Sequence, residues 1–159
     1  MLTARDACKA DAPKILALIQ ALADYEHAAH DVTAGIEDIR ARLFGPTASV
    51  AALMFEHARE TVGFAVYFHN FSTWLGRHGL FLEDLYIEPG YRRRGFGRAA
   101  MRLLAERALD LDCARFEWNV LNWNTPAIEL YEAIGARAQT EWIGYRLEGD
   151  ALRRFVAAG

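Results

Sequence analysis

The sequence predicts a single α/β domain in which helices pack on a mixed, mostly antiparallel sheet. Three observations lead to this fold class. Apolar residues recur at helical spacing in the first part of the chain, strands rich in Val, Phe and Tyr follow, and two strand–turn–helix units come last. This order is typical of a mixed sheet with helices on its faces. The 159 residues contain no repeat, charge block or linker, so residues 1–159 fit one domain.

The first part of the chain is expected to form a short strand and two helices. Residues 2–7 fit the strand. Pro13 suits the first turn of a helix with a continuous apolar stripe. A second helix is expected over residues 34–43, with Thr33 as its N-cap and Gly45 just after its end.

The remaining elements are mainly strands, interrupted by two helices. Residues 49–56 and 61–71 are rich in strand-forming residues and are separated by a short polar segment, which predicts a β-hairpin. The elements expected after the hairpin are a strand over 80–87, a helix over 97–109, a strand over 115–121, a helix over 126–134 and a final strand over 136–147.

Composition excludes several classes of protein. A net charge of −3 argues against a general nucleic-acid binder, which needs a broad basic surface. No apolar run has the length of a membrane span or signal peptide, so we expect a cytoplasmic protein without a membrane partner. Cys8 and Cys113 form no CxxC pair and are expected to be reduced and buried. His27 and His30 share a helical spacing but lack supporting carboxylates or thiolates, so no metal is expected.

The most informative stretch joins an apolar strand to a helix through a turn with three arginines and two glycines. Residues 85–87 end the strand, residues 92–94 are the arginines, and Gly95 and Gly97 precede the apolar helical pattern. Glycines let backbone N–H groups approach phosphate oxygens, and a helix N-terminus attracts negative charge. The stretch lacks the glycine patterns of dinucleotide and nucleoside-triphosphate loops, so another phosphorylated cofactor is indicated. A plain turn with a solvated charged face is the alternative interpretation.

A second strand–turn–helix unit follows the same logic. Asn124 or Thr125 suits the N-cap of its helix, Pro126 suits the first turn, and Gly135 suits the end. Tyr131 then lies about one and a half turns inside the helix.

Together these residues resemble the GNAT superfamily of acetyl-CoA-dependent N-acetyltransferases, and among them the spermidine/spermine (diamine) and thialysine acetyltransferases. The resemblance covers nearly the whole chain. Besides the arginine–glycine turn, it is carried by residues 15–19, residues 22–26, Gly63-Phe64-Ala65, Leu82-Glu83-Asp84, Trp123-Asn124 and Tyr131. It implies the GNAT fold, acetyl-CoA as cofactor, a small-molecule amine as substrate, and a homodimer, because related enzymes are commonly dimers.

The resemblance also implies roles for individual residues. The turn would hold the CoA pyrophosphate, the strand before it would bind pantetheine through its backbone, and the start of the later helix would touch CoA from the other side. The residues assigned to the cofactor in this way are Leu85, Tyr86, Ile87, Arg93, Arg94, Gly95, Phe96, Gly97, Arg98, Asn124, Thr125, Pro126 and Ala127. The residues placed near the amine are Tyr25, Glu26, Glu83, Glu117, Trp118 and Asn119.

Acetyl transfer needs a neutral amine, and an alkylamine of pKa about 10.4 is almost fully protonated near pH 7. Glu83 is the expected base, because strand alternation directs it with Leu85 and Ile87 to one face while Asp84 and Tyr86 point to the other. It would act directly or through water. Tyr131 is the expected acid that protonates the leaving thiolate.

Each of these assignments has a structural alternative. Glu83 and Asp84 could be an acidic pair held by nearby arginines, and Tyr131 could be an amphipathic helix tyrosine with a buried ring. Tyr25 and Glu26 could be a solvated helix end. The tryptophans, including Trp118, are most simply core or interface aromatics.

The sequence departs from the diamine acetyltransferases in two places. Only Asp31 among residues 27–31 is acidic, which weakens the field that would attract a polyamine, so a shorter amine such as thialysine or lysine fits at least as well. Arg93 stands where those enzymes carry glycine, and its charge should favour phosphate. A protein or peptide acetyltransferase and a CoA-binding module without catalysis remain alternatives. The apolar tail around residues 152–156 could serve an interface or close the core.

Overall fold

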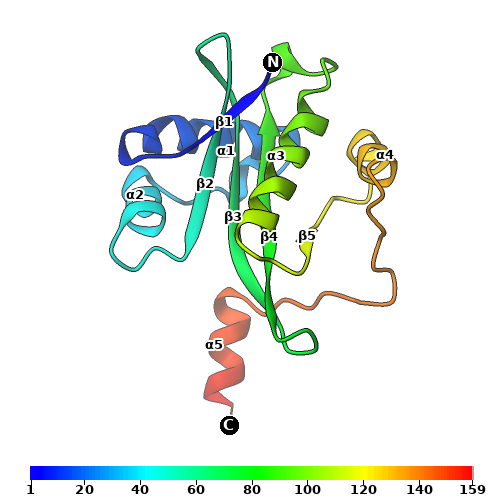
Figure 1. The fold of residues 1–159 in the computed structure, drawn as a ribbon. Helices are drawn as coiled ribbons and strands as arrows, with labels where there is room; N and C mark the ends of the chain where they lie inside the picture. The colour runs from blue at the N-terminus through cyan, green and yellow to red at the C-terminus, as the bar shows by residue number, and fades with distance from the viewer. Residues whose placement is uncertain (159) are drawn as a thin grey trace.

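The structure is a computed structural model that describes residues 1–158, and its centre is a five-stranded sheet with the order β1-β2-β3-β4-β5 (Figure 1). The strands are β1 (Thr3–Asp6), β2 (Val50–His57), β3 (Glu60–Ser72), β4 (Arg77–Ile87) and β5 (Phe116–Trp118). Neighbouring strands are antiparallel from β1 to β4, whereas β4 and β5 are parallel. The expected mixed, mostly antiparallel sheet is confirmed.

The predicted hairpin is β2 and β3, and its turn is as short as a hairpin turn can be. His57 pairs with Glu60, so only Ala58 and Arg59 connect the strands. Both residues have positive φ, at 51° and 69°. Two consecutive left-handed residues form the turn whose twist matches that of the flanking strands.

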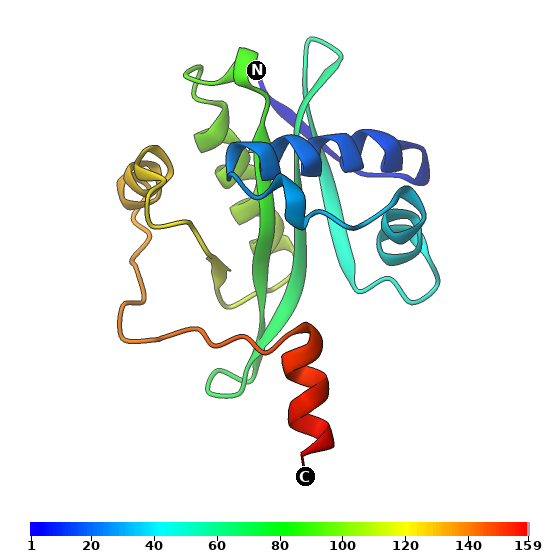
Figure 2. The same cartoon turned by 180° about the vertical axis from the view of Figure 1, so that it is seen from behind.

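Helices cover both faces of the sheet (Figures 1 and 2). Helices α1 (Ala12–Tyr25) and α2 (Ile36–Phe44) pack on one face against a core that contains Met54 and Phe64. Helix α3 (Phe96–Asp110) packs on the other face, where Leu104 is fully buried. Helix α4 (Thr125–Ala133) follows β5. The alternation of strand residues between the two cores holds α1 and α3 on opposite sides of β4.

Two expected boundaries in the middle of the chain are wrong. Helix α2 begins at Ile36 with Gly35 as its N-cap, not after Thr33, because the Asp38 carboxylate accepts a hydrogen bond of 2.8 Å from the Gly35 N–H. Strand β5 covers only Phe116–Trp118 instead of residues 115–121, because its pairing with β4 ends at Trp118.

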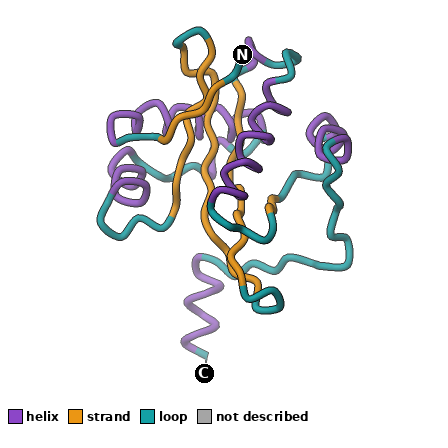
Figure 3. The backbone as a smooth tube through the Cα atoms, viewed as in Figure 1, coloured by secondary structure: helices purple, strands orange, loops and turns teal. Residues whose placement is uncertain are grey.

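The largest correction concerns the C-terminus. The expected strand over residues 136–147 does not form, and these residues run as an irregular segment to a helix, α5 (Gly149–Ala157), that the sequence analysis did not assign (Figure 3). Alternating apolar residues form a strand only when a sheet edge is available for pairing, and this segment pairs with no strand of the described chain. The tail around residues 152–156 is exposed, so it does not close the core.

Three smaller observations complete the fold. Cys113 is buried, but Cys8 is exposed, which contradicts the expectation that both are buried. Within residues 1–158, no helix combines the length and hydropathy needed to cross a membrane. In the same described part of the chain, no three His, Cys, Asp or Glu side chains gather in a way that could hold a metal ion.

Candidate active site

Strands β4 and β5 separate partway along their length, and this separation opens the sheet. Their pairing runs from Leu80↔Phe116 to Leu82↔Trp118 and stops there, although β4 continues to Ile87. After Leu82, the edge of β4 that faces away from β3 therefore has no strand beside it within the described chain. An unpaired strand edge can bind an extended ligand through its N–H and C=O groups.

A β-bulge lies at the point where the strands separate. Val66 pairs with Asp84 and Tyr67 with Leu82, so Glu83 is an additional residue of β4 without a partner on β3. Leu82 and Leu85, three residues apart, pack in the same core. The strict alternation on which we based the orientation of Glu83 is thus interrupted at that residue. Glu83 is exposed.

The bulge directs Asp84 into a partly buried position beside the end of α1. Burial, followed by the negative charges of Glu83 and Glu26, raises the pKa of Asp84 to about 6. Burial also raises the pKa of Glu26. Sequence reasoning assigned no role to Asp84, and the signal that could have found it was its position next to Glu83 at the opening of the sheet.

Tyr131 of α4 lies within electrostatic reach of Glu26 at the end of α1. Its ring packs edge-on against Trp118 of β5, with 5.0 Å between ring centroids. Burial raises its pKa, with further contributions from the charges of Glu26 and Tyr25. The tyrosine therefore stays protonated at neutral pH. Residues from α1, β4 and α4 that are far apart in sequence come within electrostatic reach of one another here.

The end of α1 and the start of α4 are joined by a hydrogen bond and an aromatic contact. The Tyr25 hydroxyl donates a hydrogen bond of 3.2 Å to the side-chain carbonyl of Asn124, and its ring lies 6.0 Å from that of Trp123. The Arg92 guanidinium lies 4.6 Å from the Tyr25 ring centroid and 5.2 Å from that of Tyr86. Arg92 thus acts in this cluster, whereas we had assigned no individual role to it.

The arginine–glycine turn ends in a helix N-terminus whose backbone donors are free. Arg93 and Gly95 have positive φ, at 61° and 77°, and α3 begins at Phe96. The N–H groups of Phe96, Gly97 and Arg98 have no intrahelical acceptor. A left-handed residue followed by exposed N–H groups forms a cradle for an anion, and the chemistry of this turn fits a phosphate group.

The side chains of this turn differ in what they contact. Arg93 and Arg94 are exposed and carry positive charge beside the cradle. The Phe96 ring is buried in the core, so only its backbone is available to a ligand. Gly97 lies close to α4, since a Cβ there would come within 3.3 Å of Leu130, and Arg98 donates to the Ala133 carbonyl at 3.1 Å. These contacts fix the start of α3 against α4.

The remaining residues expected near the amine lie along β5. Glu117 accepts a hydrogen bond of 2.7 Å from Asn70 and pairs with Arg115 at 2.6 Å. Its carboxylate is thus engaged on the side of a cavity of about 1070 Å³, which Trp118 and Asn119 also line. Tyr131 lines the same cavity. The structure therefore connects Glu117 with this cavity, not with Asp84.

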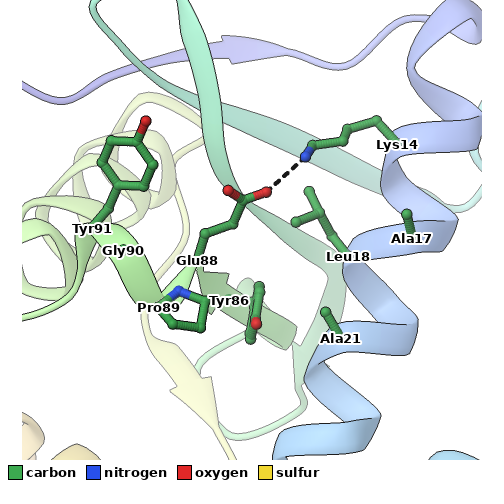
Figure 4. A pocket seen from close by; sticks show the side chains of 9 residues that line it. All are labelled: Lys14, Ala17, Leu18, Ala21, Tyr86, Glu88, Pro89, Gly90 and Tyr91. Carbon is green, nitrogen blue, oxygen red and sulfur yellow. Dashed lines mark hydrogen bonds and ion pairs between the residues drawn. The ribbon is translucent and has the colours of Figure 1, made fainter.

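A smaller cavity of about 350 Å³ lies between α1 and the end of β4 (Figure 4). Its two charged lining residues, Lys14 and Glu88, form an ion pair of 2.7 Å across it. Tyr86 of β4 also lines this cavity, whereas Glu83 and Asp84 do not. Because its charges neutralise each other, this cavity does not provide a second charged binding site.

Comparisons with known proteins agree on one family. The model of the acetyltransferase (GNAT) family matches residues 15–136. A thialysine N-epsilon-acetyltransferase of Sus scrofa is 38% identical over 96% of this chain and 95% of its own length. An L-ornithine N5-acetyltransferase of Arabidopsis thaliana is 41% identical over 57% of this chain and 40% of its own. A solved integron cassette protein of V. cholerae superposes with a TM-score of 0.81 at 23% identity, covering 98% of this chain and 97% of its own.

Proposed function

The chain belongs to the GNAT acetyltransferase family and is an N-acetyltransferase, and from this premise we propose that it acetylates the terminal amine of a lysine-like amino acid or short diamine. The acetyl donor in this proposal is acetyl-CoA, which supplies a reactive thioester. The observation that carries the proposal is the group formed by Asp84, Glu26 and Tyr131 at the place where β4 and β5 separate.

The donor's phosphates fit the cradle at the start of α3. The N–H groups of residues 96–98 would donate to pyrophosphate oxygens, with Arg93 and Arg94 supplying charge. The unpaired edge of residues 85–87 would hold the extended pantetheine chain. Residues 124–127 at the start of α4 would close the other side.

The acidic residues would bind the amine and take its proton. An ammonium group of pKa about 10.4 needs on the order of 4 to 5 kcal/mol to reach its neutral form near pH 7. Asp84 is ionised at that pH, because the pKa of its carboxyl is about 6. It would attract the ammonium together with Glu26, while the exposed Glu83 would pass the proton on through water. Asp84 and Glu83 are both retained as candidates for the base.

Tyr131 would protonate the departing thiolate. Its hydroxyl remains protonated at neutral pH, since burial raises its pKa, and the packing of its ring on Trp118 fixes its direction. A group that donates a proton as negative charge develops on sulfur lowers the barrier for breaking the carbon–sulfur bond.

The acceptor is expected to be short. Of the charged groups at the end of α1, Glu26 is partly buried, and the following residues add one acid, Asp31, which is exposed. Such a site binds one terminal ammonium better than a long polycation. The names of the relatives, which specify thialysine and ornithine, support the same class. The proposal also includes a cytoplasmic homodimer that binds no nucleic acid.

The test is an amine panel with acetyl-CoA, in which products are identified by mass spectrometry. We expect thialysine, ornithine and lysine to be acetylated with higher kcat/KM than spermidine or spermine. Peptide substrates that exceed every small amine would establish a peptide acetyltransferase instead. Binding of CoA without acetylation of any amine would establish a binding module.

The acid role is tested with Tyr131→Phe, which removes one oxygen. We expect kcat to fall by about 10²-fold or more, with little change in CoA affinity. Tyr145→Phe is the matched control, because Tyr145 is 94% exposed and lies outside this site. Turnover that is equal in both variants would remove Tyr131 from the mechanism.

A further inference from the structure

The three consecutive arginines of the arginine–glycine turn differ in how they are held. Arg93 and Arg94 are exposed, whereas Arg92 is half-buried. The Nε atom of Arg92 donates a hydrogen bond of 2.9 Å to the carbonyl of Ile87 at the end of β4. This bond uses the edge of the guanidinium group and leaves its flat faces available to other side chains. Arg92 is therefore anchored to the backbone of the strand that precedes the turn.

Arg92 and Arg94 lie toward opposite faces of the sheet. The Arg92 guanidinium lies 4.6 Å from the ring centroid of Tyr25 and 5.2 Å from that of Tyr86. Both of these tyrosines pack in the core beneath α1. The Arg94 guanidinium lies 5.3 Å from the ring centroid of Tyr91, which packs against the core beneath α3. Arg92 thus extends to the face that carries α1, while Arg94 stays on the face of the helix whose N-terminus forms the anion cradle.

The two tyrosine rings are the partners of the Arg92 charge. Among the described residues, no carboxylate forms an ion pair with Arg92, Glu26 or Asp84. A planar guanidinium stacks well on aromatic faces, and this attraction strengthens where water is partly excluded. Arg92 can therefore hold the rings without neutralising the acids that would attract the ammonium group.

Tyr25 connects Arg92 with the acidic residues. It is the last residue of α1, and Glu26 follows it directly. Its ring contacts the Arg92 guanidinium and its hydroxyl donates to Asn124, so the side chain is held at both ends. The position of Tyr25 in turn sets where the Glu26 side chain leaves the backbone. The charge of Glu26 reaches Asp84, so a displaced Tyr25 would change the group that binds the amine.

We propose that Arg92 is a positioning residue for the amine: by holding the Tyr25 ring, it keeps Glu26 beside Asp84. Arg93 and Arg94 supply charge to the cofactor, and Arg92 does not. The turn thus divides its arginines between the two substrates. This inference rests on the proposed function for the amine, whereas the contact between Arg92 and Tyr25 can be measured without catalysis.

The first experiment compares Arg92→Gln with the matched variant Arg94→Gln. The glutamine amide can replace the Arg92 Nε–H as donor to Ile87, but it leaves no charge over the rings. We expect Arg92→Gln to raise KM for thialysine by about tenfold, with the Kd for CoA within about twofold of wild type. Arg94→Gln should do the reverse, since it should weaken CoA several-fold at low salt and leave that KM within about twofold. Arg92→Lys retains the charge and should restore part of the lost amine affinity.

The second experiment is a double-mutant cycle of Arg92→Gln and Tyr25→Leu. If Arg92 acts through the Tyr25 ring, the double variant should have a KM for thialysine no higher than that of the worse single variant. In urea unfolding, the combined change in the equilibrium constant should fall short of the product of the single changes by about two- to fivefold. Circular dichroism checks that each variant is folded.

Three results would overturn the inference. A larger loss of CoA affinity than of amine affinity in Arg92→Gln would make Arg92 a phosphate ligand. Effects that multiply independently in the cycle would show that Arg92 does not act through Tyr25. An unchanged KM for thialysine in an active Arg92→Gln variant would remove Arg92 from amine binding and leave the proposed function intact. A wild type that acetylates no amine would refute the proposed function, and the unfolding cycle would still decide whether Arg92 holds Tyr25.

Discussion

Replacing Asp84 by asparagine should stabilise the folded protein in a manner that depends on pH. Folding raises the pKa of this carboxyl from an ordinary 3.8 to about 6, a difference of about 2 units. At about 1.4 kcal/mol per unit, the ionised carboxylate costs the folded state about 3 kcal/mol. The folded chain binds the proton more tightly than the unfolded chain, so this cost is absent below about pH 4, grows as pH rises to about 6 and is complete above it.

The asparagine side chain has nearly the same shape and no charge, so the variant avoids this cost. Urea unfolding, followed by tryptophan fluorescence, should give equal free energies of unfolding for variant and wild type near pH 4. Near pH 8 the variant should be more stable by up to about 3 kcal/mol. The control Asp110→Asn changes an exposed aspartate at the end of α3 and should stay within about 0.5 kcal/mol of wild type.

Acetyl transfer by the same variant should change in the opposite direction. If Asp84 binds the ammonium group, Asp84→Asn lowers kcat/KM for the amine by about tenfold or more while stability rises. In the wild type, kcat/KM should increase as pH rises through about 6, because the carboxylate is the active form. A stability difference that is equal near pH 4 and pH 8 would refute the burial argument, and an unchanged kcat/KM would refute the role in amine binding.

Three further predictions concern the arginine–glycine turn, the hydrogen bond between α1 and the start of α4, and the core under α3. Arg93→Gly should remove the cost of about 1 kcal/mol of a left-handed conformation at a non-glycine residue, so the melting temperature should stay the same or rise. It should also weaken CoA binding several-fold in a titration at low salt, because a positive charge is lost. A lower melting temperature would contradict this prediction. Tyr25→Phe removes the 3.2 Å hydrogen bond to Asn124 and should cost about 1 kcal/mol in urea unfolding; no loss would show that the bond is not formed in solution. Leu104→Ala should cost about 2 to 5 kcal/mol, whereas Leu109→Ala, which is 75% exposed on the same helix, should cost under about 1; equal losses would contradict the assigned core.

Most elements could be predicted because their signals are local. The hairpin of β2 and β3 and the helix α3 follow from residue periodicity and from turn residues within a few positions. The anion cradle is also local, since Arg93, Gly95 and the first turn of α3 are consecutive. The second strand–turn–helix unit was also predicted from its own residues, and the resemblance to acetyltransferases added a role for Tyr131. The family match confirmed the superfamily.

Elements that depend on a distant partner could not be predicted in this way. The alternation of Ile143, Tyr145 and Leu147 is the pattern of a strand, but a strand forms only where a segment pairs with a sheet edge, and this segment pairs with none within the described chain. The bulge at Glu83 depends on the pairing of β3 with β4, and it ended the alternation from which we had oriented that side chain.

The sequence by itself determined the order of strands and helices as far as α4, the arginine–glycine turn before α3 and the family, because each rests on consecutive residues or on motifs. Only the tertiary structure decided which acid is buried. The pKa of Asp84 rises because the packing around β4 excludes water from it and, to a lesser extent, because the charges of Glu83 and Glu26 lie near it. No sequence spacing encodes that burial or the approach of Glu26. In the same way, only the tertiary structure showed that residues 137–158 are exposed, since burial is a property of packed elements and not of single segments.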